Sequence, residues 1–171
     1  MKSVLLIIVF CLIGAIKSSA QYVSLEDVIV IHSSSYDKIN GLLLPKGWVF
    51  QTKRLAHDSL GTCLPNEVVW AFEPNDYADR AHSYVVLAES DNCGKKVTYQ
   101  TLDVTSYNKI RASIIKYKMT LTRSDVGELN GKSYISSTFV GARYQLDLVV
   151  YTRKDASADA GNSYNVFLLL R

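Results

Sequence analysis

Residues that carry recognisable catalytic or metal-binding chemistry are scarce in this sequence, and their scarcity reduces the number of functions that the sequence supports. The 171 residues include three cysteines and three histidines. They contain no phosphate-binding glycine loop, no dinucleotide-binding fingerprint, no His-Glu-x-x-His, no Cys-x-x-Cys and no Gly-x-Ser-x-Gly turn. We therefore expect no cofactor and no metal centre, and the motifs indicate none of the common enzyme classes.

An excess of charge of one sign is also lacking. Two of the 19 Lys and Arg residues lie in the first twenty positions, which leaves 17 against 16 Asp and Glu in the rest of the chain. There the basic residues form small, scattered pairs such as Lys95-Lys96 and Arg153-Lys154. Proteins that bind nucleic acid carry a clustered basic surface, so the charge pattern predicts no nucleic-acid partner.

The one long hydrophobic run lies at the amino terminus. Lys2 precedes the 13 residues Val4–Ile16, and the small residues Ser18, Ser19 and Ala20 follow before Gln21. This pattern is typical of a secretory signal peptide that is cleaved near Ala20-Gln21. An uncleaved membrane anchor is the alternative, but a spanning helix needs roughly 20 apolar residues. We expect residues 1–20 to be removed, which leaves a secreted or periplasmic protein without a membrane anchor.

Cysteine usage fits this compartment. Cys11 lies in the leader, so that Cys63 and Cys93 form an even pair in a protein bound for an oxidising space. A metal site or a free catalytic thiol are the alternatives, and neither cysteine has partners at ligand spacing. The sequence therefore predicts a disulfide, which would close a loop of about 30 residues and stabilise the fold by roughly 3–4 kcal/mol.

Two segments of the chain resemble one another. Ser35-Tyr36-Asp37-Lys38-Ile39 returns 71 positions later as Ser106-Tyr107-Asn108-Lys109-Ile110, and both segments continue with helical apolar spacing. A short helix is expected over 24–31. Two series of candidate strands follow the repeated segments, near 48–53, 67–72, 83–89 and 96–102, and near 120–123, 133–139, 144–153 and 163–170.

Internal similarity of this kind favours duplication of one structural unit. We therefore predict an α+β fold built from duplicated units, each a helix packed on one face of a four-stranded antiparallel sheet. The first unit is expected to span 21–102 and to contain the disulfide, and the second to span 103–171. The two units would pack as one compact domain.

Histidine supplies the main candidates for catalysis. His57 precedes Asp58 in a predicted loop, and His82 ends the polar run that begins at Glu73. The run lacks the alternating oxygen ligands and the glycine of a calcium loop. A Ser-His-Asp mechanism would also need an exposed nucleophile and oxyanion donors, for which no motif is present.

Tyrosine is the remaining compositional signal, with 11 residues against two tryptophans. We expect Trp48, Trp70 and Phe72 in the core. Strand preference alone explains many tyrosines, but tyrosine is also enriched in recognition surfaces. The candidates for an exposed binding surface are Tyr84, Tyr99, Tyr134, Tyr144 and Tyr164.

The leading hypothesis is an exported, non-catalytic module that binds another protein or a component of the cell envelope through a sheet face or its loop ends. The alternative is a small extracytoplasmic hydrolase that uses His57 or His82 with nearby carboxylates. A third hypothesis is a structural envelope protein that associates with itself through a strand edge.

Overall fold

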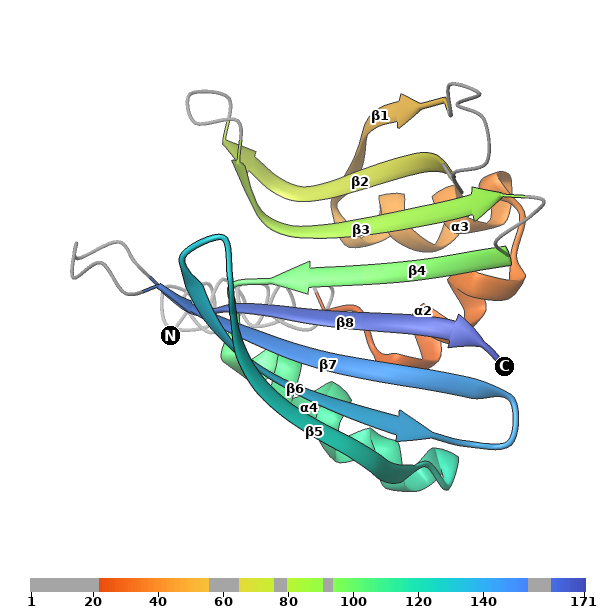
Figure 1. The fold of residues 1–171 in the computed structure, drawn as a ribbon. Coiled ribbons are helices and arrows are strands. Elements are labelled where there is room, and N and C mark those ends of the chain that lie inside the picture. Colours follow the sequence, from red (N-terminus) through yellow and green to blue (C-terminus); the bar gives the residue numbers. More distant parts are fainter. Residues whose placement is uncertain (1–21, 56–64, 76–79, 91–93, 154–160) are drawn as a thin grey trace, which may run out of the picture.

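One eight-stranded antiparallel sheet dominates the computed structural model, which describes residues 22–55, 65–75, 80–90, 94–153 and 161–171 (Figure 1). The strand order is β1-β2-β3-β4-β8-β7-β6-β5. The strands are β1 Trp48–Arg54, β2 Asn66–Asn75, β3 Arg80–Ser90, β4 Gly94–Thr101, β5 Thr120–Leu129, β6 Lys132–Val140, β7 Tyr144–Arg153 and β8 Ser163–Leu170.

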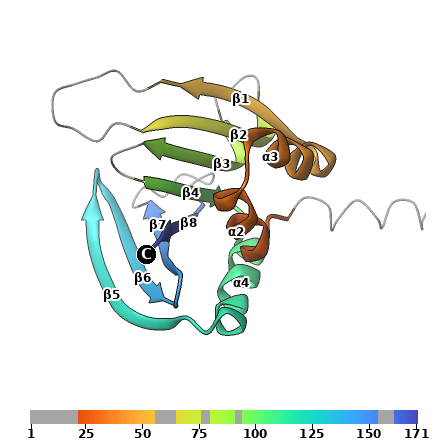
Figure 2. The ribbon, with the colours of Figure 1, turned by 90° about the vertical axis from the view of Figure 1, so that its right-hand side faces the viewer.

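In the described part of the chain, three short helices lie on one side of this sheet, as Figure 2 shows. Among the described residues, none of the helices has the length and apolar character needed to span a membrane. They are α2 Leu25–Ser33, α3 Tyr36–Leu43 and α4 Val104–Ser113, and the last two continue into the 3-10 turns η2 Leu44–Lys46 and η3 Ile114–Tyr117.

The ends of the helices follow from local side-chain chemistry. Ser24 and Asp27 form a reciprocal capping box at the start of α2, in which each side chain accepts a hydrogen bond from the other residue's backbone N–H. Lys46 donates to the Asp27 carboxylate at 2.7 Å and so ties η2 to this cap. The turn after η2 ends at Gly47, whose φ of 84° favours glycine.

Polar contacts also fix α2 on the sheet. The His32 Nε2 N–H donates to the Lys95 carbonyl oxygen at 2.9 Å, and Lys95 Nζ donates to the Ser34 carbonyl oxygen at 3.1 Å. Burial lowers the pKa of His32, and the bond to Lys95 only partly offsets that effect. The end of α2 is thereby held against the start of β4.

The predicted assembly of two four-stranded units is wrong. β4 and β8, each expected to end its own sheet, pair along Lys96–Thr101 and Tyr164–Leu169 and make one continuous sheet. Strand periodicity specifies which side chains share a face, but it carries no information on which strands become neighbours. Pairing is favourable here because two unpaired edges would have left rows of backbone N–H and C=O groups without partners.

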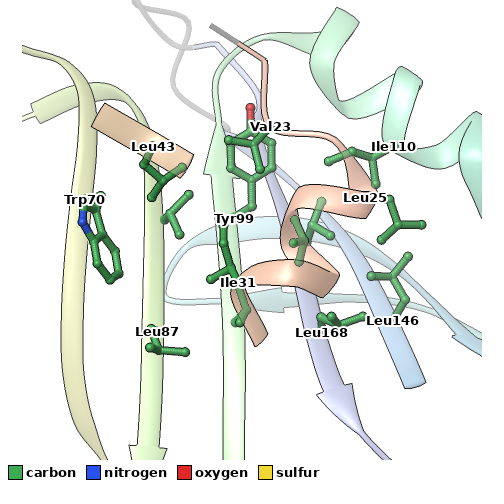
Figure 3. Close-up of a cluster of buried hydrophobic side chains, with 14 of the residues drawn as sticks. Val23, Leu25, Ile31, Leu43, Trp70, Leu87, Tyr99, Ile110, Leu146 and Leu168 are labelled. Atoms are coloured by element: carbon green, nitrogen blue, oxygen red, sulfur yellow. The ribbon is translucent and has the colours of Figure 1, made fainter. Parts of the chain in front are cut away.

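The core lies between the helices and the sheet, and Figure 3 shows its centre. Trp48, Trp70 and Phe72 are buried there, as predicted. Trp70 Nε1 donates to Asn40 Oδ1 of α3 at 2.8 Å, so that the indole N–H keeps a partner away from water. Tyr99, which the sequence marked as a surface aromatic, is only 1% exposed and also belongs to the core.

Two leucines of β8 offer a matched test of this packing. Leu168 is fully buried beside α2, whereas Leu170, two residues later on the same face, is 58% exposed. We expect Leu168→Ala to lower the free energy of unfolding by about 2–5 kcal/mol, because it opens a cavity. Leu170→Ala should cost less than about 0.5 kcal/mol. Urea unfolding measures both, and equal losses would contradict the placement of the core.

Candidate functional site

The sheet face opposite the helices is not covered by any described segment, and we call it the open face. Side chains on the open face of a flat sheet would be exposed, yet four of them are at most 9% exposed here. They come from β2, β7 and β8, each of which has a paired strand on both sides. The sheet therefore curves around them and its open face forms a shallow trough. The four residues are Val69, Ala71, Val149 and Asn165.

Two hollows lie along this trough. The first, of about 630 Å³, spans β1 to β4, and Tyr84 and Gln100 stand on its walls. The second, of about 460 Å³, extends from β5 across to Lys96 of β4 and is bordered by Tyr134, Tyr151 and Phe167. Both volumes fall within the range of sites that take small molecules or side chains of a partner.

Between the two hollows, polar side chains form the floor of the trough. Gln100 of β4 lies opposite Asn165 of β8, and the side-chain amides of both donate to the Ser163 hydroxyl at 3.3 Å. Each amide carries two N–H donors and one acceptor oxygen, so a single bond uses part of its capacity. Beside this floor, Lys96 Nζ lies 4.5 Å from the centre of the Phe167 ring, a cation–π geometry.

Charges on the open face occur in mixed pairs. Arg123 Nη2 lies 2.8 Å from Asp125 Oδ2, and Arg54 Nη1 lies 3.7 Å from Glu67 Oε2. Asp147 accepts a hydrogen bond from the Gln145 amide at 3.1 Å. Because both signs alternate over short distances, the face has no extended field of one sign and does not favour a polyanion.

A glycine makes room for one of the aromatic side chains. The rings of Tyr134 and Tyr151 lie 6.1 Å apart on neighbouring strands. Tyr134 also lies across Gly127 of β5, where an added Cβ would come within 2.6 Å of the Tyr134 hydroxyl. Glycine inside a strand often marks such a close approach, so Gly127 allows the Tyr134 ring to take its place at the border of the second hollow.

The five tyrosines predicted to form a binding surface lie in three different parts of the structure. Tyr84 and Tyr134 lie on the open face, but in different hollows. Tyr144 and Tyr164 lie on the helix side, where they contact the rings of His32 and Tyr107. Tyr99 is buried, and its burial raises the pKa of its phenol.

Sequence reasoning missed several residues of the open face, among them Tyr151, Gln100, Asn165 and Phe167. A usable signal existed in β7, because the alternation from Tyr144 to Val150 assigns the intervening odd positions to the other face. Tyr151 continues that second series.

A smaller polar cavity of about 260 Å³ lies on the helix side, at the start of α4, and contains His82 and Asp103. His82 Nδ1 lies 3.3 Å from Ser83 Oγ, but Ser83 is only 3% exposed and donates to Thr101 Oγ1 at 2.9 Å. A buried hydroxyl bonded elsewhere is a poor nucleophile.

Asp103 likewise has a structural role, as the residue that caps the start of α4. Its carboxylate caps α4 by accepting from the backbone N–H groups of Thr105 and Ser106 and from the Ser106 hydroxyl. Partial burial alone would raise the pKa of Asp103, but these hydrogen bonds outweigh it and lower the pKa. The carboxylate therefore acts mainly as a helix cap.

Three predicted residues, His57, Cys63 and Cys93, lie outside the described residues. Within the part of the chain that the structure describes, no three His, Cys, Asp or Glu side chains gather closely enough to hold a metal ion.

Comparison with family models, with curated proteins and with solved structures gives no significant match to this chain.

The contact between Gly127 and Tyr134 can be tested with a double-mutant cycle. Gly127→Ala should lower the free energy of unfolding by about 1 kcal/mol, since the new methyl group displaces the tyrosine ring. In a Tyr134→Ala background the same change should stabilise by about 0.4–1 kcal/mol, because it restricts only the unfolded chain. Urea unfolding of the four proteins gives the coupling energy. Additive effects would show that the ring does not lie over the glycine.

Proposed function

We propose that this protein is an exported, non-catalytic binding module that recognises a protein or a component of the cell envelope through its open face. The observation that carries the proposal is the trough, which no described segment covers and in which side chains as little exposed as Ala71 and Asn165 lie on the face opposite the described helices. A concave surface of this kind can enclose part of a partner, whereas a flat sheet offers contact on one plane only.

The chemistry of the trough supports a partner that is largely uncharged. Tyr84, Tyr151 and Phe167 offer aromatic contact area, while Gln100 and Asn165 offer amide donors and acceptors. Tyrosine gives large contact areas at a low cost in side-chain entropy. This mixture suits a polypeptide segment, whose backbone amides and side chains need both kinds of contact.

Paired tyrosine variants test the surface. Tyr84→Ala combined with Tyr151→Ala removes one aromatic ring from each hollow, and Tyr36→Ala removes a tyrosine that is 38% exposed on α3, on the other side of the molecule. The exported protein in these forms serves as bait for components of the source envelope, and affinity for the recovered partner is then measured. The double variant should lose about tenfold or more in affinity.

Binding by the Tyr36→Ala protein should match that of the unaltered chain. If Tyr36→Ala weakens binding as much as the double variant does, the helix side carries the contact and the proposal is wrong.

The hydrolase hypothesis has weaker support, because it rests on His82 sharing a cavity with Asp103, whose carboxylate already caps α4. Assays of the exported protein with ester, peptide and phosphoester model substrates should give no turnover above background. Turnover that disappears in His82→Ala or in His57→Ala, with the unfolding midpoint unchanged, would replace the binding proposal with an enzyme.

A further inference from the structure

The sheet ends in two edge strands, β1 and β5, and they differ in their capacity to pair with another strand. In β1 an irregularity between Phe50 and Thr52 divides the strand near its middle. In β5 the corresponding irregularity lies between Leu121 and Arg123, close to the start. Bulges protect sheet edges by interrupting the row of backbone groups. β5 therefore keeps a regular stretch of edge, Arg123–Leu129, that β1 lacks.

The backbone of this stretch faces outward at alternate residues. The Val126 N–H donates to the carboxylate of its own neighbour, Asp125 Oδ1, at 3.1 Å. It consequently points away from β6, toward the side of β5 on which no described strand pairs. In an antiparallel strand the N–H and C=O of one residue point to the same side, and the pattern repeats every second residue. Ser124 and Glu128 therefore direct their backbone groups to the same edge.

Apolar side chains accompany this edge on the helix side of the sheet. Val126, Ile135, Val150 and Tyr164 lie in one row across β5, β6, β7 and β8. Tyr164 packs on Tyr107 of α4, with ring centres 4.9 Å apart, so the inner end of the row is covered. At its outer end Val126 is 73% exposed and Ile135 is 57% exposed. The helices cover the row only in part.

We propose that β5 pairs with β5 of a second copy of this chain, antiparallel and about a two-fold axis at Val126. This register uses the whole regular stretch, and the residues placed opposite one another are Ser124 and Glu128, Arg123 and Leu129, and Asp125 and Gly127. No two like charges face each other. A register centred on Asp125 would oppose two carboxylates, and one centred on Ser124 would run across the irregularity in β5.

The pairing would cover the exposed apolar side chain at this edge and give partners to its outward-facing backbone groups. Val126 meets Val126 of the second copy, so that these two side chains lose much of their exposure, and each Ile135 continues the apolar row beside them. In this ladder Val126 can exchange two backbone hydrogen bonds with Val126 of the second copy, and Ser124 lies opposite Glu128 on either side of it. Asp125, held by Arg123 at 2.8 Å, releases the Val126 N–H as the pair forms.

The same geometry places the two open faces on one side of the joined sheet. Residues directly opposite in antiparallel strands project from the same face, so the trough of one copy continues toward that of the other. A partner with two binding segments would then gain from simultaneous contact with both copies. This consequence rests on the proposed function, whereas the pairing itself does not.

The mass of the exported protein in solution tests the pairing without any variant. Sedimentation equilibrium over a several-hundredfold range of concentration should show a reversible monomer–dimer equilibrium. A chain that remains monomeric throughout this range overturns the proposal.

Charged variants at the two-fold axis test the register. Val126→Lys should weaken dimerisation tenfold or more, because it places two ammonium groups face to face, and Val126→Glu should do the same with two carboxylates. An equimolar mixture of the two variants should dimerise again as a heterodimer. Recovery on mixing requires residue 126 of one copy to lie next to residue 126 of the other.

Leu121→Lys is the matched control, since Leu121 is on the same strand and 56% exposed but precedes the irregularity. Its dimerisation should equal that of the unaltered protein. A dimer that survives Val126→Lys, or a mixture that fails to recover, places the contact elsewhere and overturns the proposal. Loss of the dimer with Tyr84→Ala and Tyr151→Ala would instead assign self-association to the open face.

Discussion

The pairing of β4 with β8 is the constraint on which the rest of the structure depends. These two strands lie at the middle of the sheet, and their helix-side residues, including Tyr99 and Val166, form the centre of the core. α2 packs over this junction through His32 and Lys95. The same junction carries Gln100 and Asn165 on its opposite face, where they form the floor of the trough. A single strand pair thus determines both the packing of the core and the surface that we propose for binding.

Local features of the fold could be predicted from the sequence, whereas its assembly could not. Alternation of apolar and polar residues located the strands, since a half-buried strand imposes a period of two. The turn at Asn130-Gly131 and the helix end at Pro45-Gly47 depend on local backbone preferences. The union of β4 with β8 depends on contacts between distant segments, such as Tyr99 with Val166. No local pattern encodes that choice, which is why two separate sheets were predicted in place of one.

The candidate site was harder to predict for a related reason. Tyr84 and Tyr134 were found because they are aromatic, yet Tyr99 belongs to the core and Tyr144 and Tyr164 face the helices. Residue type says little about which face a side chain occupies, and only the strand register does so. The hollows also depend on curvature of the whole sheet and on one close approach, between Gly127 and Tyr134. Neither property is visible in any one segment.

The central position of β8 has a consequence for the order of events during synthesis. β8 follows every other described strand in the chain, yet it has neighbours on both sides, and the backbone N–H of Arg171 donates to the Arg143 carbonyl oxygen at 3.0 Å just beyond it. Until Ser163–Leu170 leaves the ribosome, β4 and β7 each have one edge that lacks its final partner strand. The sheet is then divided into two parts, β1 to β4 and β5 to β7. A chain truncated before Ser163 would therefore keep β4 and β7 as two additional exposed edges.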